Sequence, residues 1–103
     1  LDKPILGICG GMHILGLIYN GEIKKRQEIG LTKINFKNDF LGFHGELEVY
    51  ELHNLNVESN QFNQEASSDS SIQAIKHKEK PFYGVQFHPE VRNKNLIINY
   101  ANL

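Results

Sequence analysis

The chain has 103 residues, of which 40% are hydrophobic and 22% charged, and its formal net charge is −1. This length suits one domain with one core, and the near-neutral balance with short, interrupted basic clusters argues against a nucleic-acid partner. A single cysteine excludes an internal disulfide, and no stretch approaches the roughly 18 apolar residues of a membrane span, so we expect a reducing, cytoplasmic location.

The first predicted elements are a buried strand and a helix, joined by a glycine-rich turn. The strand lies at residues 3–6 and the helix at residues 12–19, and Gly7-Ile8-Cys9-Gly10-Gly11 lies between them. Small residues on both sides of a cysteine are typical of a nucleophile elbow, where the backbone is strained and bulky neighbours would clash. A helix N-terminus also favours thiolate over thiol. Cys9 is therefore a candidate nucleophile, and the alternative is a small buried apolar residue.

Two strands are predicted in the middle of the chain. Asn20-Gly21 is expected to end the first helix, with the glycine at positive φ. Residues 29–36 and 46–53 alternate between apolar and polar side chains, which indicates half-buried strands. Lys37-Asn38-Asp39 is expected to form a turn after the first of them.

The second half of the chain predicts three further strands and a closing helix. Residues 62–66 favour a surface strand, and residues 72–77 and 82–87 favour the two strands of a hairpin. In residues 93–103, apolar side chains at helical spacing predict a helix that packs one face on the sheet. These side chains are Leu96, Ile97, Tyr100 and Leu103.

A second group of chemically capable residues follows the last predicted strand. His88 leaves the end of that strand, and Glu90 comes two residues later, after Pro89. A histidine can take a thiol proton and return it to a leaving amine, while a carboxylate holds the ring in the required tautomer. Cys9, His88 and Glu90 therefore form a candidate catalytic triad. The alternative for the second group is a capped turn with an exposed histidine.

Together these two motifs resemble those of class I glutamine amidotransferase domains. That family carries a G-x-C-x-G-x-Q elbow, which residues 7–12 fit, and a G-V-Q-F-H-P-E stretch, which residues 84–90 match fully. Glu28-Ile29-Gly30 resembles the E-x-G segment of the family. Residues 72–91 look especially like the amidotransferase subunits of archaeal-type GMP synthases.

The resemblance implies a flavodoxin-like α/β fold with a mixed sheet, a nucleophile elbow and flanking helices. The Gly-Gly-Pro loop and the preceding strands of the family have no counterpart here. Residues 1–103 are therefore expected to form a single partial domain, the C-terminal half, without the N-terminal strands.

The resemblance also implies a reaction. Cys9 would attack the side-chain amide of glutamine, His88 would protonate the departing ammonia, Glu90 would orient His88, and water would release glutamate from a γ-glutamyl thioester. Gly10, His13 and His53 would contact the substrate: Gly10 as an oxyanion donor, His13 where the family has glutamine, and His53 in a segment similar to S-H-x-D. The ammonia would pass to an ATP-dependent synthetase subunit or domain, and no cofactor or metal is expected.

Three functions stay open at this stage. The first is a glutamine-hydrolysing amidotransferase, and the second is a γ-glutamyl peptidase or hydrolase that shares the elbow and the His-Pro-Glu motif. The third is a catalytically impaired regulatory subunit. The missing N-terminal half favours it, and so do His13 and Leu52, because the family carries glutamine and serine at those two positions. If the first is correct, His13→Gln is expected to lower the Michaelis constant.

Overall fold

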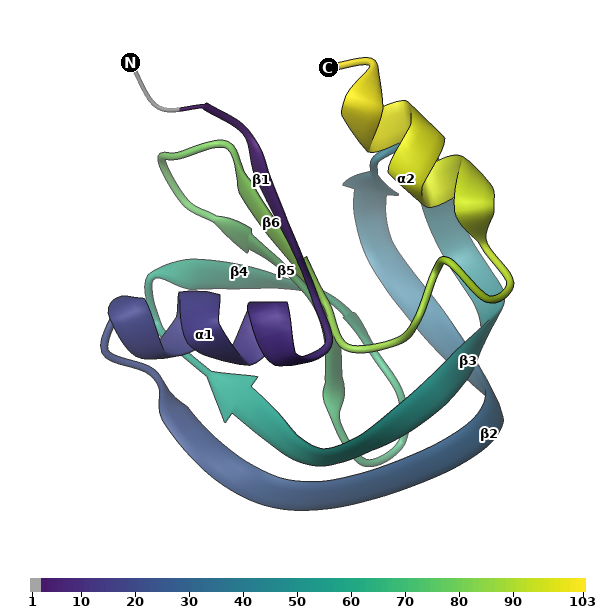
Figure 1. Ribbon diagram of the computed structural model, residues 1–103, viewed down its shortest axis with the longest axis horizontal. Coiled ribbons are helices and arrows are strands. Elements are labelled where there is room, and N and C mark those ends of the chain that lie inside the picture. The colour runs from purple at the N-terminus through teal and green to yellow at the C-terminus, as the bar shows by residue number, and fades with distance from the viewer. Residues whose placement is uncertain (1–2) are drawn as a thin grey trace.

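The computed structural model describes residues 3–103, which form one curled, mixed sheet with two helices (Figure 1). The order along the sheet is β1-β6-β5-β4-β2-β3. The elements are β1 (Ile5–Ile8), α1 (Gly10–Ile18), β2 (Glu22–Phe40), β3 (Phe43–Glu58), β4 (Phe62–Ser67), β5 (Ile72–His77), β6 (Phe82–Val85) and α2 (Lys94–Ala101). The predicted α/β class is confirmed, while the first two residues of the predicted domain lie outside the described range. Within that range neither helix is long and apolar enough to cross a membrane.

The parallel pairing of β1 with β6 brings the two ends of the chain together. Ile5 pairs with Phe82 and Ile8 with Val85, and the Cys9 N–H continues the ladder by donating to Val85 O at 2.7 Å. Parallel strands present their carboxyl ends at the same edge of a sheet. The residues that follow β1 and β6 therefore emerge side by side, as the meeting of purple and green strands shows in Figure 1.

The hairpin of β2 and β3 is longer than the sequence predicts. The turn predicted at residues 37–39 is wrong, because these residues belong to β2 and are accommodated by a shift in register between Phe36 and Phe40. The chain instead reverses at Leu41 and Gly42, which have φ of 49° and 85°. Positive φ at both central residues is the mark of a type I′ turn, whose twist matches the twist of paired strands.

Both helix ends differ in detail from their prediction. After α1 the residue with positive φ is Asn20, at 63°, and not Gly21; asparagine tolerates this conformation better than most side chains. Gly21 is needed for space, because a Cβ there would lie 2.6 Å from Gly16 O. The second helix ends at Ala101, so Leu103 lies past it and is exposed instead of packing on the sheet.

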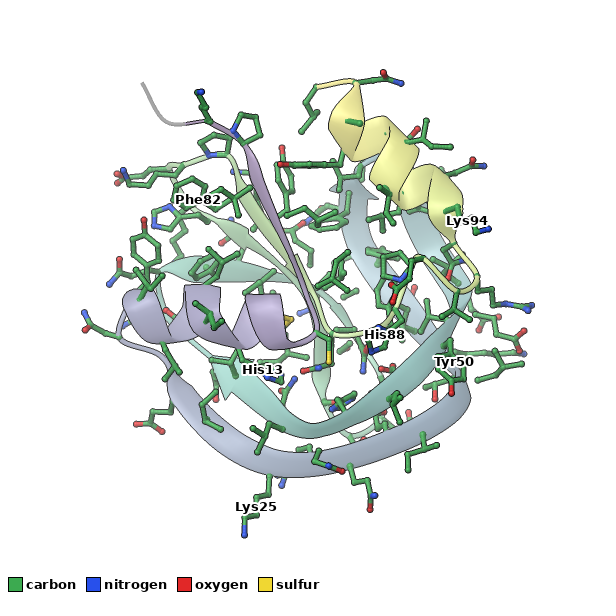
Figure 2. All side chains as sticks on the ribbon, viewed as in Figure 1. His13, Lys25, Tyr50, Phe82, His88 and Lys94 are labelled. Atoms are coloured by element: carbon green, nitrogen blue, oxygen red, sulfur yellow. The ribbon has the colours of Figure 1, made fainter. Side chains whose placement is uncertain are left out.

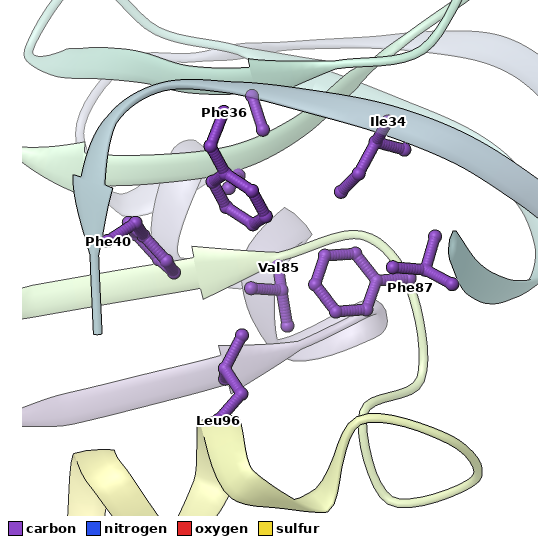
Figure 3. Close-up of a cluster of buried hydrophobic side chains, with 9 residues drawn as sticks. Ile34, Phe36, Phe40, Val85, Phe87 and Leu96 are labelled. Carbon is purple, nitrogen blue, oxygen red and sulfur yellow. The ribbon is translucent and has the colours of Figure 1, made fainter. Parts of the chain in front are cut away.

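The main core lies between the curled sheet and α2. Figure 3 shows Leu96 of α2 facing side chains of β2 and of the segment around β6. The labelled members are Ile34, Phe36, Phe40, Val85, Phe87 and Leu96. A second cluster packs α1 on the other sheet face through Met12, Leu15, Val57, Phe62, Ile75 and Phe82. Each large apolar side chain buried in this way contributes about 1.5–3 kcal/mol, and together the clusters hold both ends of the chain against the sheet.

Candidate active site

Cys9 occupies a strained turn between β1 and α1. Its φ of 52° and ψ of −104° are unusual for a residue with a side chain and cost about 1–3 kcal/mol. Gly7 is required by space, since a Cβ there would lie 2.6 Å from the backbone of Gly11. At Gly10 and Gly11 a Cβ would meet nothing within 4 Å. The expected clash is therefore found at Gly7, whereas a Cβ at Gly10 or Gly11 would not clash.

The structure brings Cys9 and His88 to one backbone oxygen. The Cys9 thiol donates to Leu52 O at 3.7 Å, and His88 Nε2 lies 3.4 Å from the same oxygen. On the other side of the ring, His88 Nδ1 lies 2.8 Å from Glu90 Oε2. Figure 2 shows His88 close to the turn between β1 and α1, with His13 on the other side of that turn. The three predicted triad residues thus lie in one group.

The backbone around His88 is anchored on both sides. Phe87 is fully buried in the main core and Pro89 is buried as well. The His88 N–H donates to Tyr50 O on β3 at 2.9 Å. The side chains of His88 and Glu90 are 22% and 50% exposed. The imidazole is therefore held at a fixed point while one side stays open to solvent.

The contact with Glu90 determines which form of His88 can accept a proton. When Nδ1–H donates to Glu90, the neutral imidazole keeps its lone pair on Nε2, the nitrogen on the side of Leu52 O, and can accept a proton there. The carboxylate of Glu90 then also stabilises the imidazolium that forms when Nε2 takes the proton. This arrangement can move a proton between Cys9 and a leaving group.

The environment of the Cys9 thiol contains opposing influences. Burial raises the pKa of the thiol, and the carboxylates of Glu51 and Glu90 add to this increase. The Gly10 N–H and the Gln86 side-chain amide lower it, but they do not cancel the increase. In the free protein the thiol is therefore stabilised relative to the thiolate, and a nearby base is needed to remove its proton.

His13 is directed at another side chain. Its Nε2 lies 2.9 Å from Gln86 Oε1, and Gln86 Nε2 in turn lies 3.8 Å from Cys9 Sγ. Gln86 belongs to the motif recognised from sequence, but nothing in the sequence indicated this contact with His13. The pairing depends on α1 and the end of β6 lying side by side.

His53 is turned inward and not toward the open side of the site. Its side chain is 1% exposed, its Nδ1–H donates to Leu55 O at 2.9 Å, and its Nε2 lies 2.9 Å from Glu28 Oε1. Burial lowers the pKa of His53, but the carboxylates of Glu51 and Glu28 outweigh this and raise it. The geometry, with both nitrogens facing acceptors, is that of an imidazolium.

Glu28 lies at the centre of a set of hydrogen bonds. Burial raises the pKa of Glu28, yet the donors around it outweigh burial and hold that pKa below its usual value. These donors are Ser71, Ser68, His53 and Ser70, and the side-chain amide of Gln73 also donates to Glu28. Glu28 lies in the segment that resembled E-x-G, which was the one signal for it in the sequence.

Glu51 was not predicted as a site residue, and its surroundings are unusual. It is 0% exposed, and within residues 3–103 neither of its carboxylate oxygens has a hydrogen-bond partner. His53 Nε2 is 3.4 Å away but closer to Glu28. Burial raises the pKa of Glu51 and the charge of Glu28 raises it further, which outweighs the opposite effect of His53. Alternation along β3 places Glu51 on the same buried face as Val49.

The same residues are the one group in the described chain with the geometry of a possible metal site. The ligand atoms of Glu28, Glu51 and His53 lie within 4.8 Å of one another. However, Glu28 is already saturated by hydroxyl and amide donors, and His53 has the geometry of a cation, whereas a metal ligand must be a neutral imidazole. The donor set suits an ion pair, and the absence of a metal stays a prediction.

The fold that carries this site is that of the class-I glutamine amidotransferases. The family model, described as glutamine amidotransferase class-I, matches residues 1–99, and the chain belongs to this family. It is 42% identical over 96 residues to the A subunit of the glutamine-hydrolyzing GMP synthase of Methanocaldococcus jannaschii, covering 85% of this chain and 51% of the relative. It is 39% identical over 98 residues to the glutamine-hydrolyzing GMP synthase of Spiroplasma kunkelii, covering 88% of this chain and 19% of that protein.

A solved structure agrees with these sequence relatives. A Thermoplasma acidophilum protein assigned as the A subunit of a GMP synthase superposes with a TM-score of 0.92 at 30% identity, covering 99% of this chain and 57% of that one. This chain thus spans about half the length of the separate A subunits that it matches. The predicted amidotransferase fold and family are confirmed.

Proposed function

We propose that this chain carries the glutamine-hydrolysing centre of an amidotransferase, with Cys9 as nucleophile, His88 as general acid and base, and Glu90 as the residue that orients His88. The observation that carries the proposal is that Cys9 Sγ and His88 Nε2 approach the same oxygen of Leu52. The side chains come from opposite ends of the chain, and Glu90 supports the far nitrogen of the ring at 2.8 Å.

In the first half of the reaction, the thiol proton of Cys9 moves to His88 Nε2 and the sulfur attacks the side-chain carbonyl carbon of glutamine. The Gly10 N–H, next to the nucleophile, donates to the oxyanion that forms. Loss of one such donor typically costs about 2.7–4 kcal/mol of transition-state stabilisation. The tetrahedral species collapses as His88 returns its proton to the amine, and ammonia leaves a γ-glutamyl thioester on Cys9.

In the second half, His88 takes a proton from water, which attacks the thioester carbonyl carbon. Collapse of this second tetrahedral species breaks the bond between carbon and sulfur, and the sulfur regains its proton from His88. The products are glutamate and free thiol. Ammonia is then the only product that a partner protein would use.

Substrate binding is assigned to three positions with different roles. Gly10 contributes its N–H, and His13 lies on α1 beside the nucleophile. His53 would act indirectly, because its buried side chain fixes the strand that presents Leu52.

The names of the relatives support a proposal for the wider setting of this chain. Several of them are the A subunits of GMP synthases or complete GMP synthases. We therefore place this chain, as part of an amidotransferase domain, beside an ATP-dependent synthetase subunit or domain that consumes the ammonia in the cytoplasm. No cofactor is needed for glutamine hydrolysis itself.

The direct test incubates the protein with glutamine, alone and with a candidate synthetase subunit, and measures ammonia. In parallel, an electrophilic glutamine analogue is added and the labelled residue is located by mass spectrometry. We expect ammonia release and labelling of Cys9, and Cys9→Ala should abolish both.

Other outcomes would indicate the alternative functions. Turnover of γ-glutamyl peptides with little glutamine hydrolysis would replace the proposal with a γ-glutamyl peptidase. Failure of Cys9 to label under every condition would replace it with a regulatory, non-catalytic subunit.

A further inference from the structure

A network of hydrogen-bonded side chains contacts Cys9 from the protein interior and takes no part in the reaction steps above. Gln86, just after β6, is 0% exposed, and Asn56, on β3, is 6% exposed. His13 on α1 is the third member of the network and contacts Gln86. Amides buried this deeply are costly unless their hydrogen bonds are made, so the direction of each bond is informative.

The orientation of the Asn56 amide is determined by backbone groups. Asn56 Nδ2 donates to Ile72 O at 2.9 Å, and the Ile72 N–H donates to Asn56 Oδ1 at 3.2 Å. A carbonyl can only accept and an N–H can only donate, so exchanging the oxygen and nitrogen of Asn56 would break both bonds. Asn56 therefore presents the second hydrogen of Nδ2 to Gln86 Oε1, at 2.8 Å.

This bond determines the orientation of the Gln86 amide. Its Oε1 accepts from Asn56 Nδ2, and His13 Nε2 lies 2.9 Å from the same oxygen, so His13 carries a hydrogen on Nε2. Gln86 Nε2 must then face the other way, toward Cys9 Sγ at 3.8 Å. A flipped amide would set its NH₂ against two donors.

The direction of this last bond matters for the sulfur. Leu52 O accepts from the thiol and thus favours its protonated form, and the charges of Glu51 and Glu90 do the same. The Gly10 N–H and the Gln86 N–H oppose them, while His88 on the open side is the proton acceptor. Gln86 is the side chain whose hydrogen bond favours a thiolate at Cys9.

We propose that Asn56 and His13 are positioning residues that hold the Gln86 amide with its N–H directed at Cys9 Sγ, and so stabilise the attacking thiolate. The inference deepens the proposed function, because it assumes that Cys9 is the nucleophile. Asn56 would act only through Gln86 and would never touch the substrate.

The test measures thiolate formation directly, without glutamine. Because Cys9 is the single cysteine of the chain, the rate of its alkylation by iodoacetamide against pH reports one group. We expect Asn56→Leu and Gln86→Leu each to raise the midpoint of that profile by about 1 pH unit, so that alkylation below the midpoint slows about tenfold. Asn54→Leu is the matched control, on the same strand but exposed, and should leave the profile unchanged.

A double variant separates a role through Gln86 from a general loss of structure. If Asn56 acts through Gln86, Asn56→Leu combined with Gln86→Leu should shift the midpoint no further than Gln86→Leu alone. Should Asn56→Leu fail to fold, Asn56→Ser, which is smaller and keeps a hydroxyl, takes its place. Additive shifts would overturn the role of Asn56, and an unchanged profile in Gln86→Leu would overturn the whole inference.

The alkylation result does not depend on glutamine hydrolysis. Shifted profiles in a protein that releases no ammonia would support the stabilisation of the Cys9 thiolate by Gln86 and Asn56 and would reject the proposed function. Ammonia release with unshifted profiles would support the proposed function and reject this inference.

Discussion

Leu52 shows how a residue can matter through its backbone alone. Its side chain is 51% exposed, yet its carbonyl oxygen is the point at which Cys9 and His88 meet. The sequence gives no sign of this role, because every residue has a carbonyl. The roles of Cys9, His88 and Glu90 could be predicted, because they depend on the residue types and on their spacing in the two motifs.

At His13 the contact with Gln86 gives a physical reason for a kinetic prediction. The Nε2–H of His13 is already donated to Gln86, so only Nδ1 of the ring is left for the substrate. We expect His13→Gln to offer a free amide group worth about 1 kcal/mol, and therefore to lower the Michaelis constant for glutamine about fivefold. Steady-state rates of ammonia release at a series of glutamine concentrations measure this constant.

The matched control for this change is Ile14→Gln, which adds the same side chain at the next, exposed position of α1. It should leave the Michaelis constant where it is. An unchanged or higher constant in His13→Gln would reject the prediction.

The burial of Glu51 predicts that the free energy of unfolding depends on pH. Its pKa in the folded protein is raised, mainly by burial, above the ordinary value of 4.5 that applies when the chain is unfolded. The native state therefore holds this proton more tightly, so the contribution of Glu51 is fully present below about pH 4.5 and is lost as pH rises through the raised value. Relative to wild type, Glu51→Gln should gain about 1.4 kcal/mol for each pH unit by which the pKa is raised, as the pH increases from about 4 to above the raised value.

Urea unfolding of both proteins across this pH range measures the difference. Glu46→Gln, an exposed position on the same strand, should stay within about 0.5 kcal/mol of wild type throughout. A constant difference between Glu51→Gln and wild type from pH 4 to pH 8 would show that Glu51 is not the titrating group.

At the scale of elements, alternation predicted the centres of the strands better than their ends. The segment at residues 22–28 is polar and mostly exposed, so no apolar period marks it as the start of β2. Residues 37–39 have the composition of a turn but remain in the strand through a shift in register. The actual turn uses Leu41 at positive φ, which local propensity does not favour. Pairing with a partner strand overrides local preference in each case.

The contact between α1 and β3 predicts a stability difference between two glycines of one helix. A Cβ at Gly16 would lie 2.3 Å from Val57 Cγ2, in the core under the helix, whereas a Cβ at Gly11 would meet nothing within 4 Å. We expect Gly16→Ala to lower the free energy of unfolding by about 1–3 kcal/mol through overpacking. Gly11→Ala should raise it by up to about 1 kcal/mol through helix propensity.

Denaturant unfolding of the two variants gives the comparison. Equal stability of Gly16→Ala and Gly11→Ala would mean that α1 moves away from β3 at no cost, which would contradict the close packing.

At the scale of the whole molecule, one parallel strand pair explains why the two sequence motifs meet. β1 and β6 come from opposite ends of the chain and end at the same edge of the sheet, and the long β2–β3 hairpin curls beneath them (Figure 1). The carbonyl oxygen of Leu52, on β3, lies near both Cys9 and His88. The sequence indicated that the motifs belong together. It could not indicate the register of β3, and therefore neither the oxygen of Leu52 nor the amide of Asn56 could be assigned to the site in advance.

The most direct test of this pairing is the rate at which an electrophilic glutamine analogue labels Cys9 in wild type and in His88→Asn, followed by mass spectrometry at neutral pH. If His88 accepts the thiol proton, labelling of His88→Asn should be slower by a factor of about 10²–10⁴. Equal labelling rates in the two proteins would contradict the pairing of Cys9 with His88.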